Sequence, residues 1–137
     1  MDSLFQQAFQ NPSKTAIIDQ FGSYSYLELT YKAKAIAFYL LQEKGDLNDA
    51  RVAYMVSPGL DYVAVQWGIW MAGGIAVPLC ITYPFPSIQY VIEDTGAEII
   101  LVGQEYEEIL KPYTEDPMKR FIRLFEGIPD SKRFDLP

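Results

Sequence analysis

Apolar and polar residues alternate along this chain in blocks that predict strands and helices in turn. Short apolar runs rich in β-branched residues are typical of buried strands, whereas apolar residues spaced three and four apart are typical of helices. On these patterns, strands are predicted at 51–56, 75–79, 98–102 and 121–125, and helices at 26–44, 60–72, 87–94 and 104–110. Because helix and strand alternate four times, the predicted fold class is α/β and layered, with a mainly parallel sheet flanked by helices and right-handed crossovers.

A small β-hairpin is predicted to precede these elements. The β-rich runs 15–19 and 24–26 flank a turn at 21–23. Ser25 and Glu28 then have the Ser-x-x-Glu spacing of a capping box, in which each side chain accepts an N–H at the start of a helix. The hairpin is therefore expected to lead directly into the first long helix.

The predicted helix 60–72 is apolar on nearly every side. One stripe contains Trp67, which we expect in the core, and an opposite stripe contains Tyr62, Val65 and Ile69. A helix that is apolar all round is buried on both sides. We therefore expect one face to pack on the sheet and the second stripe to dock on a partner outside the chain, either the remainder of a parent enzyme or a second copy.

Composition limits the classes of function. The chain has 137 residues, 50% of them hydrophobic, and a net charge of −7, which disfavours nucleic acid and anionic membranes. One α/β domain is expected at 1–126, followed by a polar, proline-rich linker at 127–137. The longest apolar segment is interrupted by glutamine and glycine, so no membrane span is expected. A single cysteine and the lack of a signal-peptide pattern predict a cytoplasmic location.

Few residues offer chemistry. The chain has no histidine, which removes the commonest general base and the commonest metal ligand. Gly73 and Gly74 follow a predicted helix rather than precede one, so they predict a helix C-cap and a tight turn instead of a phosphate loop. Ser57 is expected to cap helix 60–72. The acidic clusters near 93–94 and 105–108 are expected to be solvated. No catalytic residue and no metal ligand is assigned.

Three further side chains are expected to have structural roles. Asp19 and Asp61 lie near the ends of predicted elements, where capping or surface residues are common, and have no evident pairing partner. Cys80 follows an apolar strand and is expected to be a small buried residue. The better ligand candidate is the stiff loop 82–86, which follows a predicted parallel strand at the sheet edge where α/β folds bind ligands. An ordinary surface connection is the alternative reading of this loop.

Four motifs occur in a characteristic order: Tyr-Ser-Tyr-Leu-Glu-Leu at 24–29, Arg-Val-Ala at 51–53, Gly-Ile-Trp-Met-Ala-Gly-Gly-Ile-Ala-Val-Pro-Leu at 68–79, and Asp-Thr-Gly-Ala at 94–97. Their spacing resembles the N-terminal subdomain of the adenylate-forming enzymes, the AMP-dependent acyl-CoA synthetases and ligases, over about residues 3–125. Val-Gln-Trp at 65–67, together with the glycine-to-leucine run and Gln-Glu-Tyr at 104–106, is similar to the malonyl-CoA or short-chain acyl-CoA synthetase branch.

This resemblance implies a parent ligase of fatty acid metabolism that uses ATP and Mg²⁺ to join a carboxylic acid to AMP and then transfers the acyl group to CoA. It also implies that Tyr83 and Phe85, in the loop aligned with a CoA-contacting loop of some relatives, bind the CoA nucleotide. The family's Ser/Thr/Gly-rich loop closing on Pro-Lys-Gly is missing, and Asn-Asp-Ala stands at 48–50 in place of the usual Gly-Asp. We therefore expect this chain alone to be inactive and to bind none of these cofactors tightly.

Three hypotheses follow. The first is a fragment of an acyl-CoA synthetase that serves as scaffold for the rest of the enzyme. The second is a free-standing, non-catalytic α/β binding or dimerisation module. The third is a receiver-like or flavodoxin-like signalling domain. It needs clustered carboxylates at the first strand end with a lysine at a later strand end, or a phosphate-binding loop, but Asp19 stands alone and no lysine ends a predicted strand.

Overall fold

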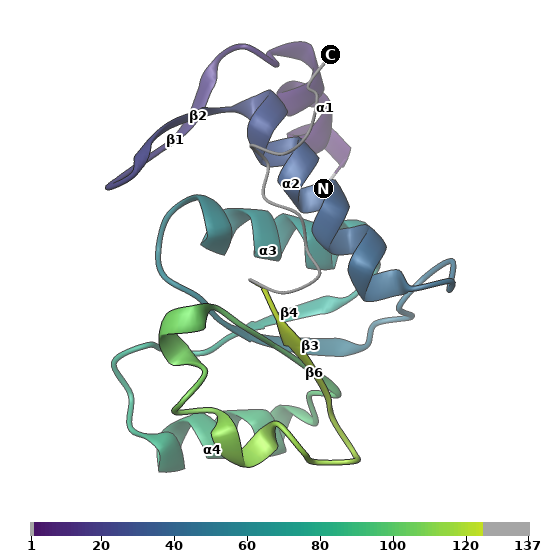
Figure 1. Ribbon diagram of the computed structural model, residues 1–137. Coiled ribbons are helices and arrows are strands. Elements are labelled where there is room, and N and C mark those ends of the chain that lie inside the picture. The colour runs from purple at the N-terminus through teal and green to yellow at the C-terminus, as the bar shows by residue number, and fades with distance from the viewer. Residues whose placement is uncertain (1, 125–137) are drawn as a thin grey trace.

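A computed structural model describes residues 2–124, and Figure 1 shows how its elements are stacked. The strands are β1 (Thr15–Asp19), β2 (Gly22–Ser25), β3 (Arg51–Met55), β4 (Ile75–Pro78), β5 (Ile99–Val102) and β6 (Arg120–Arg123). The helices are α1 (Asp2–Gln10), α2 (Tyr26–Leu41), α3 (Leu60–Met71) and α4 (Phe85–Thr95), with short 3-10 helices η1 (Gln104–Tyr106) and η2 (Lys111–Tyr113). The predicted linker at 127–137 lies outside the described residues, so the domain boundary stays a prediction.

Strands β3 to β6 form one parallel sheet in the order β4-β3-β5-β6. Val52 of β3 lies opposite both Ala76 of β4 and Ile99 of β5, which places β3 inside the sheet. Strands β1 and β2 form a separate antiparallel hairpin. The predicted α/β class, the mainly parallel sheet and the preceding hairpin are confirmed.

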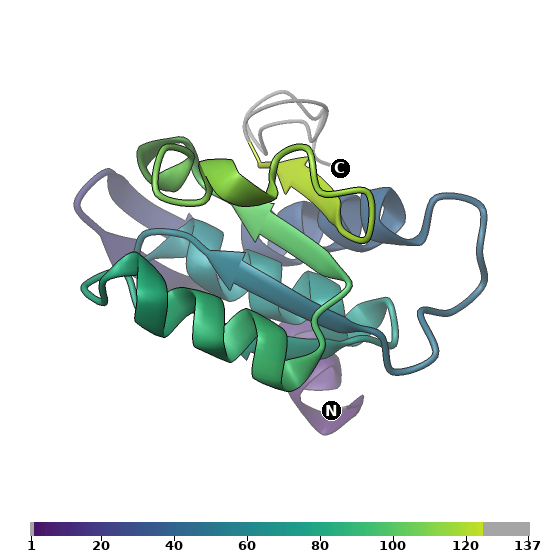
Figure 2. The same cartoon turned by 90° about the horizontal axis from the view of Figure 1, so that it is seen from below.

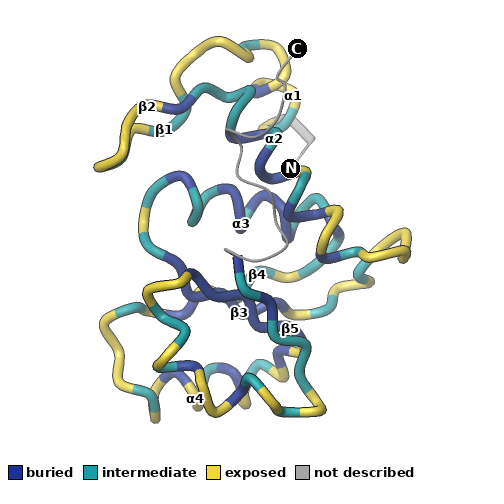
Figure 3. The backbone as a smooth tube through the Cα atoms, viewed as in Figure 1, coloured by how far each residue is buried: buried dark blue, intermediate teal, exposed yellow. Residues whose placement is uncertain are grey.

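Helices cover both faces of the main sheet (Figure 1). Because successive side chains of a strand point to opposite faces, Val52 and Tyr54 pack in the core that contains α3, whereas Ala53 and Met55 pack in the core that contains α4. Seen from below, α4 lies in front of the sheet (Figure 2). Helix α2 packs on the outer side of α3. The two inner strands of the main sheet, β3 and β5, are buried along most of their length, whereas β4 and β6 at its edges are only partly buried (Figure 3).

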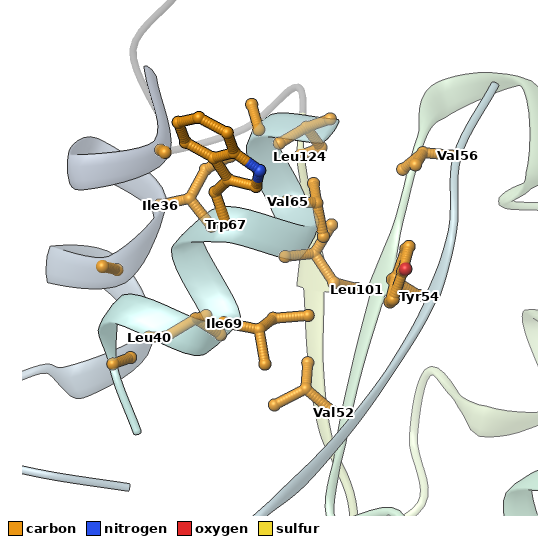
Figure 4. Close-up of a cluster of buried hydrophobic side chains, with 14 of the residues drawn as sticks. Ile36, Leu40, Val52, Tyr54, Val56, Val65, Trp67, Ile69, Leu101 and Leu124 are labelled. Carbon is orange, nitrogen blue, oxygen red and sulfur yellow. The ribbon is translucent and has the colours of Figure 1, made fainter. Parts of the chain in front are cut away.

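Helix α3 is buried on both sides by the chain itself. Val65 and Ile69 are fully buried and point toward the sheet (Figure 4). On the other side, a Cβ atom added at Gly68 would lie 2.8 Å from the Ile36 side chain of α2, so the two helices approach closely there. Trp67 is 5% exposed, which confirms its predicted place in the core.

The predicted docking stripe on this helix is therefore wrong for Val65 and Ile69. Both side chains are covered by the sheet, while α2 covers the opposite face, so neither is available to an outside partner. Tyr62 is partly buried and packs edge-to-face on Tyr54, with ring centroids 5.3 Å apart. The sequence pattern correctly indicated two buried faces but not that α2 would supply the second cover.

The predicted helix caps have mixed outcomes. The capping box is confirmed: the Glu28 N–H donates to Ser25 Oγ at 3.1 Å, and the Ser25 N–H donates to Glu28 Oε1 at 3.4 Å. Gly73 and Gly74 also act as predicted, because Gly73 has φ +82° and their N–H groups bond carbonyls in the last turn of α3. Ser57 does not cap α3, whose N-cap residue is Gly59 with no capping side chain of its own.

Several predicted elements differ in the structure, and α2 ends at Leu41 rather than at 44. Helix α4 begins at Phe85 rather than at 87, because proline is tolerated in a first helical turn and Pro86 lies there. The predicted helix 104–110 is replaced by η1 and a following turn, and η2 carries Pro112, which lacks the N–H that a longer helix would need. Helix α1, which buries Ala8, was not predicted.

Candidate functional site

The carboxyl ends of β3 and β4 open onto a crevice. The chain leaves β3 toward α3 on one face of the sheet and leaves β4 toward α4 on the opposite face (Figures 1 and 2). Adjacent parallel strands whose connections diverge in this way leave a gap between them, which is the usual ligand position in open α/β sheets. The carboxyl ends of β3 and β4 are therefore where this fold is expected to bind a ligand.

A pocket of about 470 Å³ lies at this crevice. Its walls are the end of β3 with the start of α3, and the end of β4 with the residues that follow it. The lining residues are Val56, Pro58, Gly59, Tyr62, Pro78, Leu79, Cys80 and Ile81. None of these side chains carries a formal charge, so the pocket suits an uncharged, largely apolar group.

Cys80 lies at the exposed mouth of this pocket, which corrects the expectation of a buried cysteine. Its Sγ is 3.2 Å from Thr82 Oγ1, and the N–H of Tyr83 donates to the Cys80 carbonyl at 3.2 Å. The side-chain hydrogen bond with Thr82 lowers the pKa of the Cys80 thiol. The strand ends one residue earlier than its apolar run suggests, and the chain turns outward there.

The two predicted ligand-binding residues lie in different surroundings. Tyr83 is 53% exposed in the loop beyond the pocket. Phe85 is partly buried at the start of α4, and its ring packs against Tyr113 with centroids 6.1 Å apart. Tyr83 thus offers a free aromatic face, whereas Phe85 anchors the loop to the core beneath it.

A side-chain network joins the ends of β3 and β5. Ser57 Oγ donates to Glu105 Oε2 at 2.6 Å and lies 3.0 Å from Tyr106 Oη. Because the single Ser57 proton points to Glu105, the Tyr106 hydroxyl donates to Ser57. Glu105 is exposed, as the sequence predicts, but its hydrogen bond with Ser57 was not predicted, because the two residues are 48 positions apart.

Asp19 occupies the start of α3. Its carboxylate accepts the Leu60 N–H at 3.1 Å and the Phe21 N–H at 2.8 Å, and the Leu60 hydrogen bond is the main reason that its pKa is lowered. A carboxylate at a helix N-terminus also interacts favourably with the helix dipole. Asp61, in the first turn of α3, forms an ion pair with Lys32 of α2. Both aspartates were expected to be capping or surface residues without a pairing partner. Asp19 does cap a helix, but both side chains bond residues distant in sequence.

Other acidic residues serve local structure. The Tyr113 hydroxyl donates to Glu93 Oε1 at 3.0 Å. Burial is the main cause that raises the pKa of Tyr113 to about 12, and the hydrogen bond to Glu93 is the second cause.

Among the described residues, no cluster of acidic, cysteine and histidine side chains has the arrangement of a metal site. Within the same part of the chain, no helix combines the length and hydrophobicity that a bilayer crossing requires.

The arrangement favours binding over catalysis. The pocket has apolar walls, a thiol at its mouth and an exposed tyrosine beyond it. The N-terminus of α3, the natural position for a phosphate at this edge, already holds the Asp19 carboxylate. The described residues around the pocket therefore do not provide the positive charges or the open helix N-terminus that a nucleoside triphosphate and its metal ion would need.

Comparison with known proteins assigns the chain to a family. The family model described as AMP-binding enzyme matches residues 4–131. The mitochondrial malonate–CoA ligase ACSF3 of Mus musculus is 34% identical over 116 residues, which cover 82% of this chain and 20% of the ligase. Gramicidin S synthase 2 of Brevibacillus brevis is 37% identical over 100 residues, which cover 73% of this chain and 2% of the synthase.

Solved structures share the fold. The inhibitor-bound N-terminal domain of FACL13 from Mycobacterium tuberculosis superposes with a TM-score of 0.76 at 18% identity, covering 88% of this chain and 32% of that one. This chain thus spans about a fifth of the length of the malonate–CoA ligase and about a third of that domain.

Proposed function

This chain belongs to the AMP-binding enzyme family, and on that premise we propose that it forms the N-terminal subdomain of an ATP-dependent acyl-CoA synthetase of the malonate or short-chain branch. The observation that carries the proposal is the family match across residues 4–131. The 34% identity to a malonate–CoA ligase supports malonate as the carboxylic acid substrate.

The proposed overall reaction has two parts. A carboxylate displaces pyrophosphate from ATP, with Mg²⁺ present, and the thiol of CoA then displaces AMP from the acyl group. The residues around the described pocket lack the cations and open helix N-terminus that would hold Mg-ATP. We therefore assign no step of the adenylation to this chain, and we propose that alone it is inactive and binds these cofactors weakly.

The proposed contribution of this segment is a rigid binding edge. Tyr83 and Phe85 are proposed to contact the CoA nucleotide, with Tyr83 supplying an exposed ring and Phe85 holding the loop through Tyr113. The uncharged walls of the pocket suit an apolar or neutral part of that ligand. Phosphate groups would have to be neutralised from outside this edge, because Asp19 and Glu105 flank it.

The alternative is a free-standing binding or dimerisation module. The stripe of Tyr62, Val65 and Ile69 was expected to dock either on the remainder of a parent enzyme or on a second copy. It now supports neither hypothesis, because two of the three side chains are fully buried. Ile18 in β1 and Phe21 in the hairpin turn, each 77% exposed, are among the exposed apolar side chains that still favour the free-standing module. The mass of the native gene product distinguishes the two hypotheses: several hundred residues would support the synthetase, and a stable product of 137 residues would support the free-standing module.

We also propose a cytoplasmic location, which cell fractionation tests.

The direct test is thioester formation by the purified native gene product. With ATP, Mg²⁺ and CoA, malonate should give malonyl-CoA, detected by mass spectrometry, faster than acetate, succinate or an amino acid does. A preference for a short monocarboxylate such as acetate would indicate a short-chain acyl-CoA synthetase rather than a malonyl-CoA synthetase. Absence of any acyl-CoA product across the panel would contradict the proposed function.

A further inference from the structure

One wall of the pocket at the carboxyl edge is a four-residue segment, 56–59, which we call the pocket wall. Val56, Pro58 and Gly59 line the pocket, and Ser57 lies between them. The pocket wall connects β3 to α3 and belongs to neither element, so the ladder and helix hydrogen bonds do not fix all of it. Its position must depend on other contacts.

The first contact holds the pocket wall from the β5 side. Ser57 Oγ bonds Glu105 Oε2 at 2.6 Å and Tyr106 Oη at 3.0 Å, and both partners lie in η1. Neither partner lines the pocket. A hydrogen bond to an ionised carboxylate is stronger than one between neutral groups, so Glu105 is the main anchor at this end.

The second contact holds the pocket wall from the hairpin side. Asp19 bonds the N–H of Leu60, the residue that follows the pocket wall, at 3.1 Å. A Cβ atom added at Gly59, where φ is +128°, would lie 2.6 Å from Asp19 Oδ2. The close approach of this carboxylate therefore depends on glycine at 59. Asp19 does not line the pocket either.

We propose that Glu105 and Asp19 are positioning residues that set the shape of the pocket, and through it the affinity for the CoA-type ligand. Glu105 acts on the pocket wall through Ser57, and Asp19 acts on it through the N–H of Leu60, the next residue along the chain. The choice of ligand rests on the proposed function, whereas the effect on pocket shape does not. Loss of either anchor releases a segment that carries three of the lining residues.

The first experiment titrates the ¹⁵N-labelled 137-residue chain with CoA and follows the amide signals of Ile81 and Tyr83. Glu105→Ala should weaken the apparent affinity by roughly threefold to tenfold, the size expected for one lost hydrogen bond of ordinary net strength, because this bond is exposed to solvent. Glu105→Gln, which keeps an acceptor for Ser57, should restore most of it. Glu108→Ala is the matched control, because Glu108 is an exposed glutamate nearby and should leave the affinity unchanged.

The Asp19 anchor is tested in the same way. Asp19→Ala should weaken CoA binding, and Asp19→Asn, which keeps an oxygen acceptor for the Leu60 N–H, should recover it. A merely structural role would lower the melting temperature of the alanine variants without changing their CoA affinity at a temperature where they are folded. Equal affinity of folded wild type and Glu105→Ala would overturn the proposal.

A second experiment needs no natural ligand. Cys80 is the single cysteine of the chain and lies at the pocket mouth, so its alkylation rate reports on the pocket. N-phenylmaleimide should react faster than N-methylmaleimide, because the ring enters the apolar pocket. Glu105→Ala should lower this ratio by about threefold or more, the effect of one lost hydrogen bond, and Glu105→Gln should restore it.

The two experiments separate two kinds of failure. If CoA shifts no amide signal in the wild type while the maleimide ratio changes as expected, the CoA assignment fails and the positioning role stands. If the ratio is the same in wild type, Glu105→Ala and Asp19→Ala, the positioning role is wrong whatever CoA does.

Discussion

The Asp19 carboxylate accepts a hydrogen bond from the backbone N–H of Leu60, with the oxygen and nitrogen 3.1 Å apart across 41 positions of sequence. This contact ties the β1–β2 hairpin to the first turn of α3. Gly59, the N-cap residue of α3, has no side chain that could accept a hydrogen bond from the first turn of the helix. Asp19 takes this role and satisfies the Leu60 N–H. An internal anion thus takes the position that a bound phosphate would occupy at this edge of the sheet.

Removal of this cap should destabilise the chain. Asp19→Ala is expected to lower the free energy of unfolding by about 1 kcal/mol, the usual value for a lost capping side chain. Asp19→Asn keeps an oxygen acceptor, so its loss should be smaller. Urea unfolding followed by circular dichroism measures both, and an alanine variant as stable as wild type would argue against the cap.

The same carboxylate predicts a dependence of stability on pH. The pKa of Asp19 is lowered in the folded chain, chiefly by the Leu60 hydrogen bond, from about 3.9 in the unfolded chain. The unfolded state therefore binds the proton more readily, and the contribution of Asp19 to stability is present above about pH 4 and is lost as the pH falls through the folded pKa. Between pH 5 and pH 3, wild type should lose more unfolding free energy than Asp19→Asn. Equal losses of unfolding free energy in the two proteins would show that Asp19 does not cause the pH dependence.

Burial of α3 by the chain itself makes Ile69 a core residue. Ile69→Ala should cost about 2–5 kcal/mol of unfolding free energy, because it removes buried atoms and leaves a cavity. Ile18→Ala, at a site 77% exposed, is the control and should change stability by less than about 0.5 kcal/mol. Denaturant unfolding compares the two. If Ile69→Ala costs no more than Ile18→Ala, Ile69 is not a core residue, and the predicted docking stripe on α3 would again be supported.

Close contact between α2 and α3 depends on Gly68. A Cβ there would lie 2.8 Å from the Ile36 side chain and 2.9 Å from the Ala33 carbonyl, so Gly68→Ala should destabilise the chain by about 1–3 kcal/mol despite alanine's better helix propensity. A Cβ at Gly45 would meet nothing within 4 Å, so Gly45→Ala is the matched control. Thermal unfolding distinguishes them, and equal melting temperatures would contradict the packing described.

The fold was predictable because its signals are local. The capping box of Ser25 and Glu28, the helical spacing of α2 and the apolar strand runs lie within a few residues of one another, and each was confirmed. Helix α1 and the interrupted η1 region were not predicted well. Their form depends on tertiary packing and on the proline at 112, which short-range periodicity represents poorly.

The candidate site was predictable only in part. The loop after β4 was singled out because a parallel strand ends there, and a pocket does lie at that edge. The partners of Asp19 and Glu105 were not predicted, because each side chain bonds a residue more than 40 positions away and only the folded topology brings them together. The docking stripe on α3 failed for a related reason: burial on two sides is visible in a sequence, but the identity of the covering element is not.

The central claim is that this segment supports an adenylate-forming enzyme without carrying its adenylation chemistry. The measurement that tests it most directly is pyrophosphate release from ATP in the presence of Mg²⁺, CoA and malonate, run side by side on the native gene product and on the 137-residue chain. The gene product should release pyrophosphate only when malonate or a near relative is present, and the 137-residue chain should stay at background. Malonate-dependent release by the 137-residue chain, or none by the gene product with any carboxylate, would contradict the account.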